Sequence, residues 1–538
     1  RQTIVEAGLK WNEAFEKAGF KNAVQMKIMP DDATWDPADI RYNVIRWVSS
    51  ANPTYGAIGP SFVNPRTGQI LGADITIEWF SGSATPIWDE LYNDITGHSQ
   101  SSLHFPGMDQ QHYAHCTLAS ELKAQLMTGM TVLDATDASP EAVSEMHKQF
   151  LTYLIMHEMG HTLGLNHNMK SSQMLSPEEI HNKELTRKIG LIGSVMDYPA
   201  INVAADRSKQ GDYYTTKAGP YDLWAIEYGY TPFSESEEEA GLNKILSRST
   251  DPKLAFGNDG DDMRSPGKAM DPRVNVNDLT SDAIAYAAER FKLVNMTMQK
   301  LVSKYSKKGQ SYAELRGRYS MLTSQRTGMI SAVSRYIGGV YVDRSFPEQN
   351  SPNKPFTPVP LATQKKAMSV LTKYVFAPNA FDADAQVFPY LQPQRRGFNQ
   401  SGNGDDFRVT NNILNMQIQG ALAHLLHPAT LQRMTNSRLY GNQYSVASMM
   451  NDLQSAIFSA DLTTNVNVYR QYLQTTFVKA LLSMIEKTSP HDDVSKAAAL
   501  YTLRKIKTQL ATAVSTNEET KAHRANLSFL ITKGLEAK

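Results

Sequence analysis

Apolar and polar positions follow distinct periods along the first 80 residues. Apolar side chains recur at near-helical spacing over residues 1–19, which predicts an amphipathic helix that ends at Gly19. Alternation over 24–29 and a β-branched, aromatic run over 42–48 each predict a strand. Residues 62–77 predict a β-hairpin, because the turn contains Pro and Gly and the second arm, 70–78, alternates regularly.

A long helix is predicted to begin at Ser139. Ser139 can cap it, Pro140 suits the first helical position, and Glu141 favours the positive end of the helix dipole. The apolar pattern continues to Leu163, and Gly164 is a natural stop. A further short helix is expected over 221–228, again followed by a glycine.

The pattern changes after about residue 231, where helical periodicity dominates. Residues 281–305 predict one long helix, 338–342 a short strand, and the proline-rich stretch 346–360 a linker or an extended arm. Residues 361–538 read as almost wholly helical. We therefore expect four parts, namely 1–230, a helical extension over 231–345, a linker over 346–360 and a helical domain over 361–538.

Composition narrows the class of protein. The 538 residues carry 54 basic and 54 acidic side chains, so zero net charge gives no electrostatic case for nucleic acid or an anionic membrane as partner. Cys116 is the single cysteine, which excludes a disulfide within the chain. The sequence has no run of about 18 apolar residues, so it predicts no transmembrane helix. Because the chain begins with Arg1, we expect that any export signal has already been removed.

The stretch HEMGHTLGLNH at 157–167 contains the candidate metal-binding and catalytic residues. His157 and His161 lie four positions apart, so they project about 40° apart on the expected helix and can reach one metal ion. A turn at Gly164 would bring His167 back as a third ligand. Three neutral imidazoles that leave a coordination position open are typical of catalytic zinc, and Glu158 beside the first ligand can accept a proton from a water.

This extended motif resembles that of the metzincin metallopeptidases. The resemblance extends to Met196 in the sequence SVMDYP, which fits the methionine-containing turn that lies beneath the zinc in that clan. In some metzincins a tyrosine two positions after that methionine reaches the metal or the oxyanion, and Tyr198 matches it. The alternative is that Tyr198 only packs beneath the site.

Further motifs narrow the resemblance to a family of large bacterial zinc-dependent metalloproteases with a metzincin-type domain. They are the hairpin at 64–75, RYNVIRW at 41–47, GLNHN at 164–168, and GPYD at 219–222 followed by AIEYGY. The resemblance implies an α/β (α+β) catalytic domain over 1–230, with a twisted sheet above the active-site helix, followed by a mostly helical C-terminal half. It also implies an export signal, another domain upstream, and a periplasmic, extracellular or outer-membrane-associated location.

On this basis we expect a zinc-dependent endopeptidase in which Glu158 is the general base and Tyr198 stabilises the oxyanion. The sheet is expected to be mostly parallel. The arm 70–78, with Leu71, Gly72 and Ala73, is the candidate sheet edge for binding an extended peptide or protein substrate, and a mid-sheet strand is its alternative. Two other functions remain open: a zinc peptidase or amidase for short peptides, and a non-catalytic binding protein on the same scaffold.

Three weaker signals have plain interpretations. His112 and His115 lie three positions apart beside Cys116, but no second pair of ligands follows them, and Cys116 reads as a small buried hydrophobic residue. The acidic stretch 258–262 could offer oxygen ligands to calcium, yet it lacks the spacing of a calcium-binding loop. We expect a surface turn there.

Overall fold

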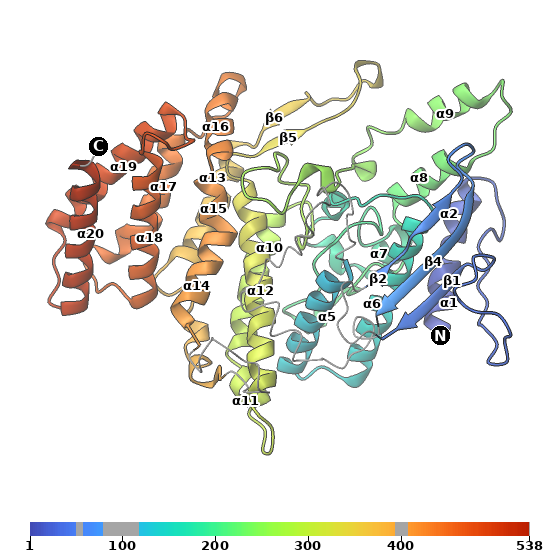
Figure 1. The fold of residues 1–538 in the computed structure, drawn as a ribbon, viewed down its shortest axis with the longest axis horizontal. Helices are drawn as coiled ribbons and strands as arrows, with labels where there is room; N and C mark the ends of the chain where they lie inside the picture. Colours follow the sequence, from blue (N-terminus) through green and yellow to red (C-terminus); the bar gives the residue numbers. More distant parts are fainter. Residues whose placement is uncertain (50–56, 79–117, 393–406, 537–538) are drawn as a thin grey trace.

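The computed structural model describes residues 1–49, 57–78, 118–392 and 407–536 (Figure 1). A small sheet and the helices around it lie at one end of the molecule, and a helical array extends from them to the C-terminus (Figure 1). The fold is therefore α+β with a mostly helical C-terminal half, as predicted.

The sheet is mixed rather than mostly parallel in the described part of the chain. Its order is β1-β4-β2, with β3 also paired to β4. β1 pairs with β4 in parallel, whereas β2 and β3 are antiparallel to β4. The strands are β1 (Val44–Val48), β2 (Ala57–Ile58), β3 (Ser61–Val63) and β4 (Ile70–Glu78). The predicted strand over 42–48 and the predicted hairpin are both confirmed.

These pairings show whether residues 70–78 lie at the edge of the sheet, as predicted, or in its middle. β4 has β1 on one side and β2 and β3 on the other, so the prediction that it forms the sheet edge is wrong. Around Leu71–Ala73, β3 pairs Phe62 with Gly72 and Ser61 with Ala73. The backbone N–H of Ala73 also donates to the side chain of Asn43 at 2.9 Å.

The N-terminal region departs from the prediction in two places. The helix expected over 1–19 is broken near Trp11 into α1 (Gln2–Leu9) and α2 (Asn12–Lys17), and the buried Trp11 indole donates to the carbonyl of Met156 at 3.1 Å. The strand expected over 24–29 does not form. The side chain of Asn12 bonds both backbone groups of Val24, and Met26 packs against Gly8 of α1. The alternation there reflects packing on a helix, not pairing in a sheet.

Five helices follow the sheet up to residue 246 in the described chain. The long one, α6, begins with Ser139 as its cap, whose Oγ accepts from the N–H of Ala142, as predicted. The helix expected over 221–228 forms but continues through Gly229 to Tyr230. The five are α5 (Leu118–Ala135), α6 (Pro140–Thr162), α7 (Lys183–Ile189), α8 (Pro220–Tyr230) and α9 (Glu238–Leu246).

The remaining elements are helical apart from one two-stranded arm. The helix expected over 281–305 is interrupted at Gln299 and Lys300. The proline-rich stretch 346–360 carries β6 (Phe356–Pro358), which pairs antiparallel with β5 (Val340–Val342). The helices are α10 (Ala283–Met298), α11 (Leu301–Tyr305), α12 (Ala313–Arg335), α13 (Leu361–Leu371), α14 (Val409–Gln417), α15 (Ala423–Leu425), α16 (Pro428–Ser437), α17 (Val446–Phe458), α18 (Val468–Met484), α19 (Asp493–Thr512) and α20 (Glu518–Glu536).

One hydrophobic cluster connects the two ends of the molecule, since its buried members run from Ala7 to Ile531. α12 lies near the middle of this array (Figure 1). Its buried Arg326 makes two hydrogen bonds, of 2.8 and 2.9 Å, with the buried carboxylate of Asp384. This paired fork satisfies both charges, which makes their burial tolerable.

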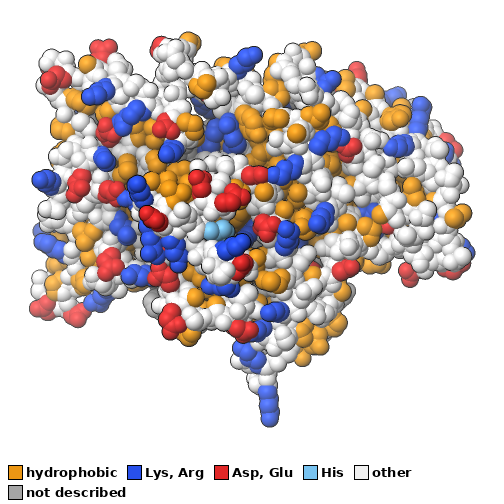
Figure 2. Space-filling model, turned by 180° about the vertical axis from the view of Figure 1, so that it is seen from behind, with side chains coloured by type: hydrophobic (Ala, Val, Ile, Leu, Met, Phe, Trp, Pro, Cys, Tyr) orange, Lys and Arg blue, Asp and Glu red, His pale blue; other side chains and the backbone are white. Residues whose placement is uncertain are grey.

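The surface mixes charges of both signs. Acidic and basic side chains are interspersed over the face shown in Figure 2, in keeping with the zero net charge. Over the described residues, no helix combines the length and apolar character that crossing a membrane requires.

Candidate metal centre

The last two turns of α6 carry the first two histidines, and the helix ends in a sharp reversal. The N–H of Leu165 bonds the carbonyl of Gly160, and the N–H of Gly164 bonds that of His161, both at 3.0 Å. Gly164 has φ +91°, a conformation that glycine adopts at little cost. This helix ending turns the chain back toward the helix, so that His167 returns to the side chains of His157 and His161.

The three histidines meet as the sequence predicted. One ring nitrogen from each lies within 4.8 Å of the others, and the Nε2 atoms of His161 and His167 are 3.1 Å apart. The ring centroids are separated by 4.7 to 5.5 Å. His157 is fully buried and His167 nearly so, while His161 is half-buried.

The opposite nitrogen of each ring faces an oxygen. Nδ1 of His157 lies 2.7 Å from the carbonyl of Val195, and Nδ1 of His161 lies 3.0 Å from that of Leu165. Nδ1 of His167 contacts the carboxylate of Asp259. An oxygen acceptor at Nδ1 favours a proton there, which leaves the Nε2 lone pairs for a common metal ion.

Burial keeps the first two rings in the neutral form that binds metals. Desolvation, followed by the neighbouring histidines, lowers the pKa of His157 well below its usual value. Desolvation, followed by the charge of His167, lowers the pKa of His161 to about 4. Three imidazoles held in fixed orientations, with the rings of His157 and His161 kept neutral, fit zinc.

Met196 lies directly against the helix turn between the two ligands. A Cβ atom at Gly160 would lie 2.3 Å from the Met196 sulfur, so these two residues are in close contact. Met196 is fully buried, and its carbonyl accepts from the N–H of Asn168, the residue after His167. The Met196 side chain therefore packs against the helix between His157 and His161, and its backbone bonds the residue after His167.

Two buried aspartates shape the segment around Met196. Asp222 accepts from the Ser194 hydroxyl at 2.5 Å and from the Val195 N–H at 2.8 Å. Asp197 accepts from Ser171, from the N–H of Ser172 and from the N–H of Tyr198. Burial raises the pKa of Asp222 to about 6. The GPYD motif at 219–222 thus has a structural role, because its aspartate holds the residues just before Met196.

Tyr198 reaches the histidine cluster. Its hydroxyl lies 2.9 Å from Nε2 of His167, and its ring is stacked near His157 with centroids 5.5 Å apart. The guanidinium of Arg264 lies 5.5 Å from the centre of the Tyr198 ring. The hydroxyl therefore faces the same nitrogen of His167 that would bind a metal.

Glu158 is fully buried beside the first ligand. The residue after β2, Gly59, packs on it so closely that a Cβ at Gly59 would lie 2.5 Å from the Glu158 carbonyl oxygen and 3.2 Å from its Oε2. The chain just after β2 thus approaches α6 at the position of Glu158, and β4 also contacts α6.

The sequence alone did not identify two residues that contact the histidine cluster or its neighbours, Asp259 and Arg264. Asp259 belongs to the stretch 258–262 that was considered for calcium, yet its carboxylate serves His167 and Arg264. Asp261 contacts Arg344 at 3.1 Å and Asp262 contacts Lys268 at 2.7 Å. These pairings give no support to calcium binding. His112, His115 and Cys116 lie outside the described residues.

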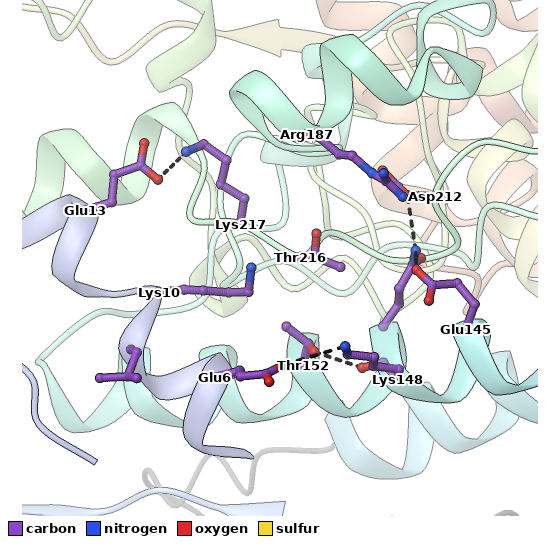
Figure 3. Close-up of a pocket in the computed structure, with 12 residues that line it drawn as sticks. Glu6, Lys10, Glu13, Glu145, Lys148, Thr152, Arg187, Asp212, Thr216 and Lys217 are labelled. Carbon is purple, nitrogen blue, oxygen red and sulfur yellow. Dashed lines mark hydrogen bonds and ion pairs between the residues drawn. The ribbon is translucent and has the colours of Figure 1, made fainter. Parts of the chain in front are cut away.

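A separate cavity of about 530 Å³ lies between α1, α2, the first half of α6 and the loop before α8 (Figure 3). Its charges are largely paired: Lys217 with Glu13, Lys148 with Glu6 at 3.6 Å, and Arg187 with Asp212 at 3.3 Å. Burial, then the charge of Lys217, lowers the pKa of Lys10, which also lines the cavity. None of the three histidines is among the lining residues that the structure describes, so this cavity is distinct from the candidate metal centre.

Comparison with known proteins agrees with this geometry. The family model described as Met-zincin matches residues 139–465, which include the histidine motif, Met196, Tyr198 and Asp259. No curated protein and no solved structure matches the chain.

Proposed function

The chain belongs to the Met-zincin family of zinc metallopeptidases, and from this premise we propose that it is a zinc-dependent endopeptidase. The observation that carries the proposal is the convergence of one ring nitrogen each from His157, His161 and His167. The three residues would hold the ion through Nε2, because each Nδ1 is occupied by an oxygen acceptor. Zinc bound there supplies a Lewis acid, which acidifies a water and polarises a peptide carbonyl.

Glu158 is proposed as the general base. It is one position from His157 on the helix, about 100° around the axis, so it flanks the ligands without being one of them. Its carboxylate would take the proton of the attacking water and deliver it to the amine that leaves. The contact with Gly59 supports this role, because it holds the Glu158 backbone where the sheet meets the helix.

Tyr198 is proposed to stabilise the charge that develops on the substrate carbonyl oxygen. A hydroxyl that already lies 2.9 Å from Nε2 of His167 is within reach of the group that reacts there. Met196 is proposed to form the packing floor of the site, corresponding to the methionine turn of metzincins, without binding the metal. Its contact with Gly160 supports that role.

The substrate, location and domain division are further parts of the proposal. We propose peptide or protein substrates, no nucleic-acid partner, and an exported protein with another domain upstream. The division at residue 230 also stays a prediction, and one observation bears on it. Asp259, which lies beyond that boundary, contacts a proposed zinc ligand.

The proposal is tested with zinc analysis and a peptide library on the same preparation. The full chain, stripped with a chelator and reloaded, should bind near one zinc ion and cleave members of a proteome-derived library read by mass spectrometry. The stripped protein is the control and should not cleave. A zinc content near zero after reloading would contradict the metal assignment. One bound zinc with no cleavage of any peptide would contradict the endopeptidase assignment.

A further inference from the structure

The third histidine differs from the other two in what holds its Nδ1 nitrogen. His157 and His161 face neutral backbone carbonyls from nearby loops. His167 instead faces the carboxylate of Asp259, which lies 92 positions further along the chain. A charged acceptor binds an imidazole N–H more strongly than a neutral one and raises the basicity of the opposite nitrogen.

Asp259 is itself held in place by its other oxygen. Arg264 Nη1 lies 3.1 Å from Asp259 Oδ1, and Arg264 Nη2 lies 3.0 Å from the carboxylate of Glu121 on α5. A short 3₁₀ turn, Asp259–Asp261, is capped by Asn258, whose side chain accepts from the N–H of Gly260. Glu121, Arg264, Asp259 and His167 therefore form one connected chain of charged and hydrogen-bonded groups.

The same arginine also contacts the other side of the site. Its guanidinium lies 5.5 Å from the centre of the Tyr198 ring, and the Tyr198 hydroxyl lies 2.9 Å from Nε2 of His167. The network thus touches His167 at both nitrogens, directly through Asp259 and indirectly through Tyr198. The two acidic residues that follow Gly260 are not part of this network, because Asp261 pairs with Arg344 and Asp262 pairs with Lys268.

We propose that Asp259 is a positioning residue for His167, and that Arg264 fixes Asp259 and holds a positive charge beside Tyr198. The affinity and geometry of the metal site then depend on residues 258–264, far from the histidine motif in sequence. This inference rests on the proposed zinc site and goes beyond it. It assigns to His167, alone among the three proposed ligands, a charged residue that orients its ring.

The test compares Asp259→Ala and Asp259→Asn with Asp262→Asn in the full-length chain. Asp262 is the matched control, because it lies in the same acidic stretch but contacts Lys268. Zinc affinity is measured by competition with a chromophoric chelator. Loss of a carboxylate behind a histidine ligand typically weakens metal binding by 10–100-fold, so we expect that loss in Asp259→Ala and wild-type affinity in Asp262→Asn.

Cobalt substitution supplies a readout that a merely structural role would not change. The visible absorption of bound Co²⁺ reports the ligand geometry, and we expect it to shift in Asp259→Ala and, to a smaller extent, in Arg264→Lys. Circular dichroism of the metal-free proteins should match wild type. Should Asp259→Ala fail to fold, Asp259→Asn, which keeps the side-chain shape, decides the question by the same two measurements.

The outcomes separate this inference from the proposed function. Wild-type protein that binds no zinc would overturn both. Wild-type protein that binds one zinc, together with Asp259 variants whose zinc affinity is within twofold of wild type and whose Co²⁺ spectrum is unchanged, would overturn only the positioning role. Weaker binding in Asp259→Ala but equally weak binding in Asp262→Asn would also overturn it, because the effect would belong to the acidic turn as a whole.

Discussion

The contact between Met196 and Gly160 predicts that alanine is poorly tolerated at position 160. In the middle of a helix, Gly→Ala normally stabilises by up to about 1 kcal/mol. At Gly160 the added Cβ would lie 2.3 Å from the Met196 sulfur, far inside the usual contact distance of about 3.5–4.0 Å, and 3.3 Å from the Trp11 ring, slightly inside it. Overpacking of this kind costs about 1–3 kcal/mol, which offsets or exceeds the gain in helix propensity.

The matched control is Gly328→Ala in α12. Gly328 lies in the interior of a long helix, whereas Gly160 lies in the last turn of α6. The nearest atom to an added Cβ at Gly328 would be 3.7 Å away, an ordinary contact. Each variant adds one methyl group to a helix, and the two differ chiefly in what that methyl group meets, so the difference in stability reports the contacts of position 160 with Met196 and Trp11. Urea unfolding followed by tryptophan fluorescence should place Gly160→Ala about 1–3 kcal/mol below Gly328→Ala. Equal stability of the two variants would refute the argument that Met196 packs tightly against the turn between the histidines.

Three further predictions concern residues around the site. Met196→Leu should cost less than about 1.5 kcal/mol in unfolding free energy and keep its zinc; loss of zinc would instead indicate direct coordination by the sulfur. Gly59→Ala should lower turnover at unchanged zinc content, because its Cβ would press on the Glu158 backbone at 2.5 Å, and wild-type turnover would contradict this. Burial raises the pKa of Asp278 to about 7, so the folded state binds more protons than the unfolded state between about pH 4 and 7. The unfolding free energy of wild type should therefore decline relative to Asp278→Asn as the pH rises through that window, and parallel pH profiles would be evidence against it.

The features that the sequence predicted correctly are those with a local cause. The spacing of His157, Glu158 and His161 on a helix, the cap at Ser139 and the reversal at Gly164 each depend on residues within a few positions of one another. Met196 and Tyr198 could be placed only through the resemblance to metzincins, and the contacts with Gly160 and His167 now give them a physical setting.

The features that the sequence did not predict depend on partners far along the chain. The alternation over 24–29 has the period of a strand, but Asn12 binds the backbone of Val24 and prevents pairing there. The order of strands in the sheet follows from non-local pairing, so nothing within 70–78 indicated that β4 would lie between other strands. Asp259 lies 92 positions from His167, and its acidic neighbours suggested a cation site of its own.

The central claim is that three histidines hold a zinc ion while Glu158 does the proton transfer, and the substitution Glu158→Ala tests it most directly. Zinc content and turnover are measured on the same preparation, with a substrate from the peptide library. Glu145→Ala serves as the control, since it removes an exposed carboxylate from the same helix about three and a half turns earlier. The account predicts near-complete zinc occupancy in both variants, with turnover lowered by about 10²–10⁴-fold or more in Glu158→Ala alone. Full zinc occupancy with unchanged turnover in Glu158→Ala would contradict it.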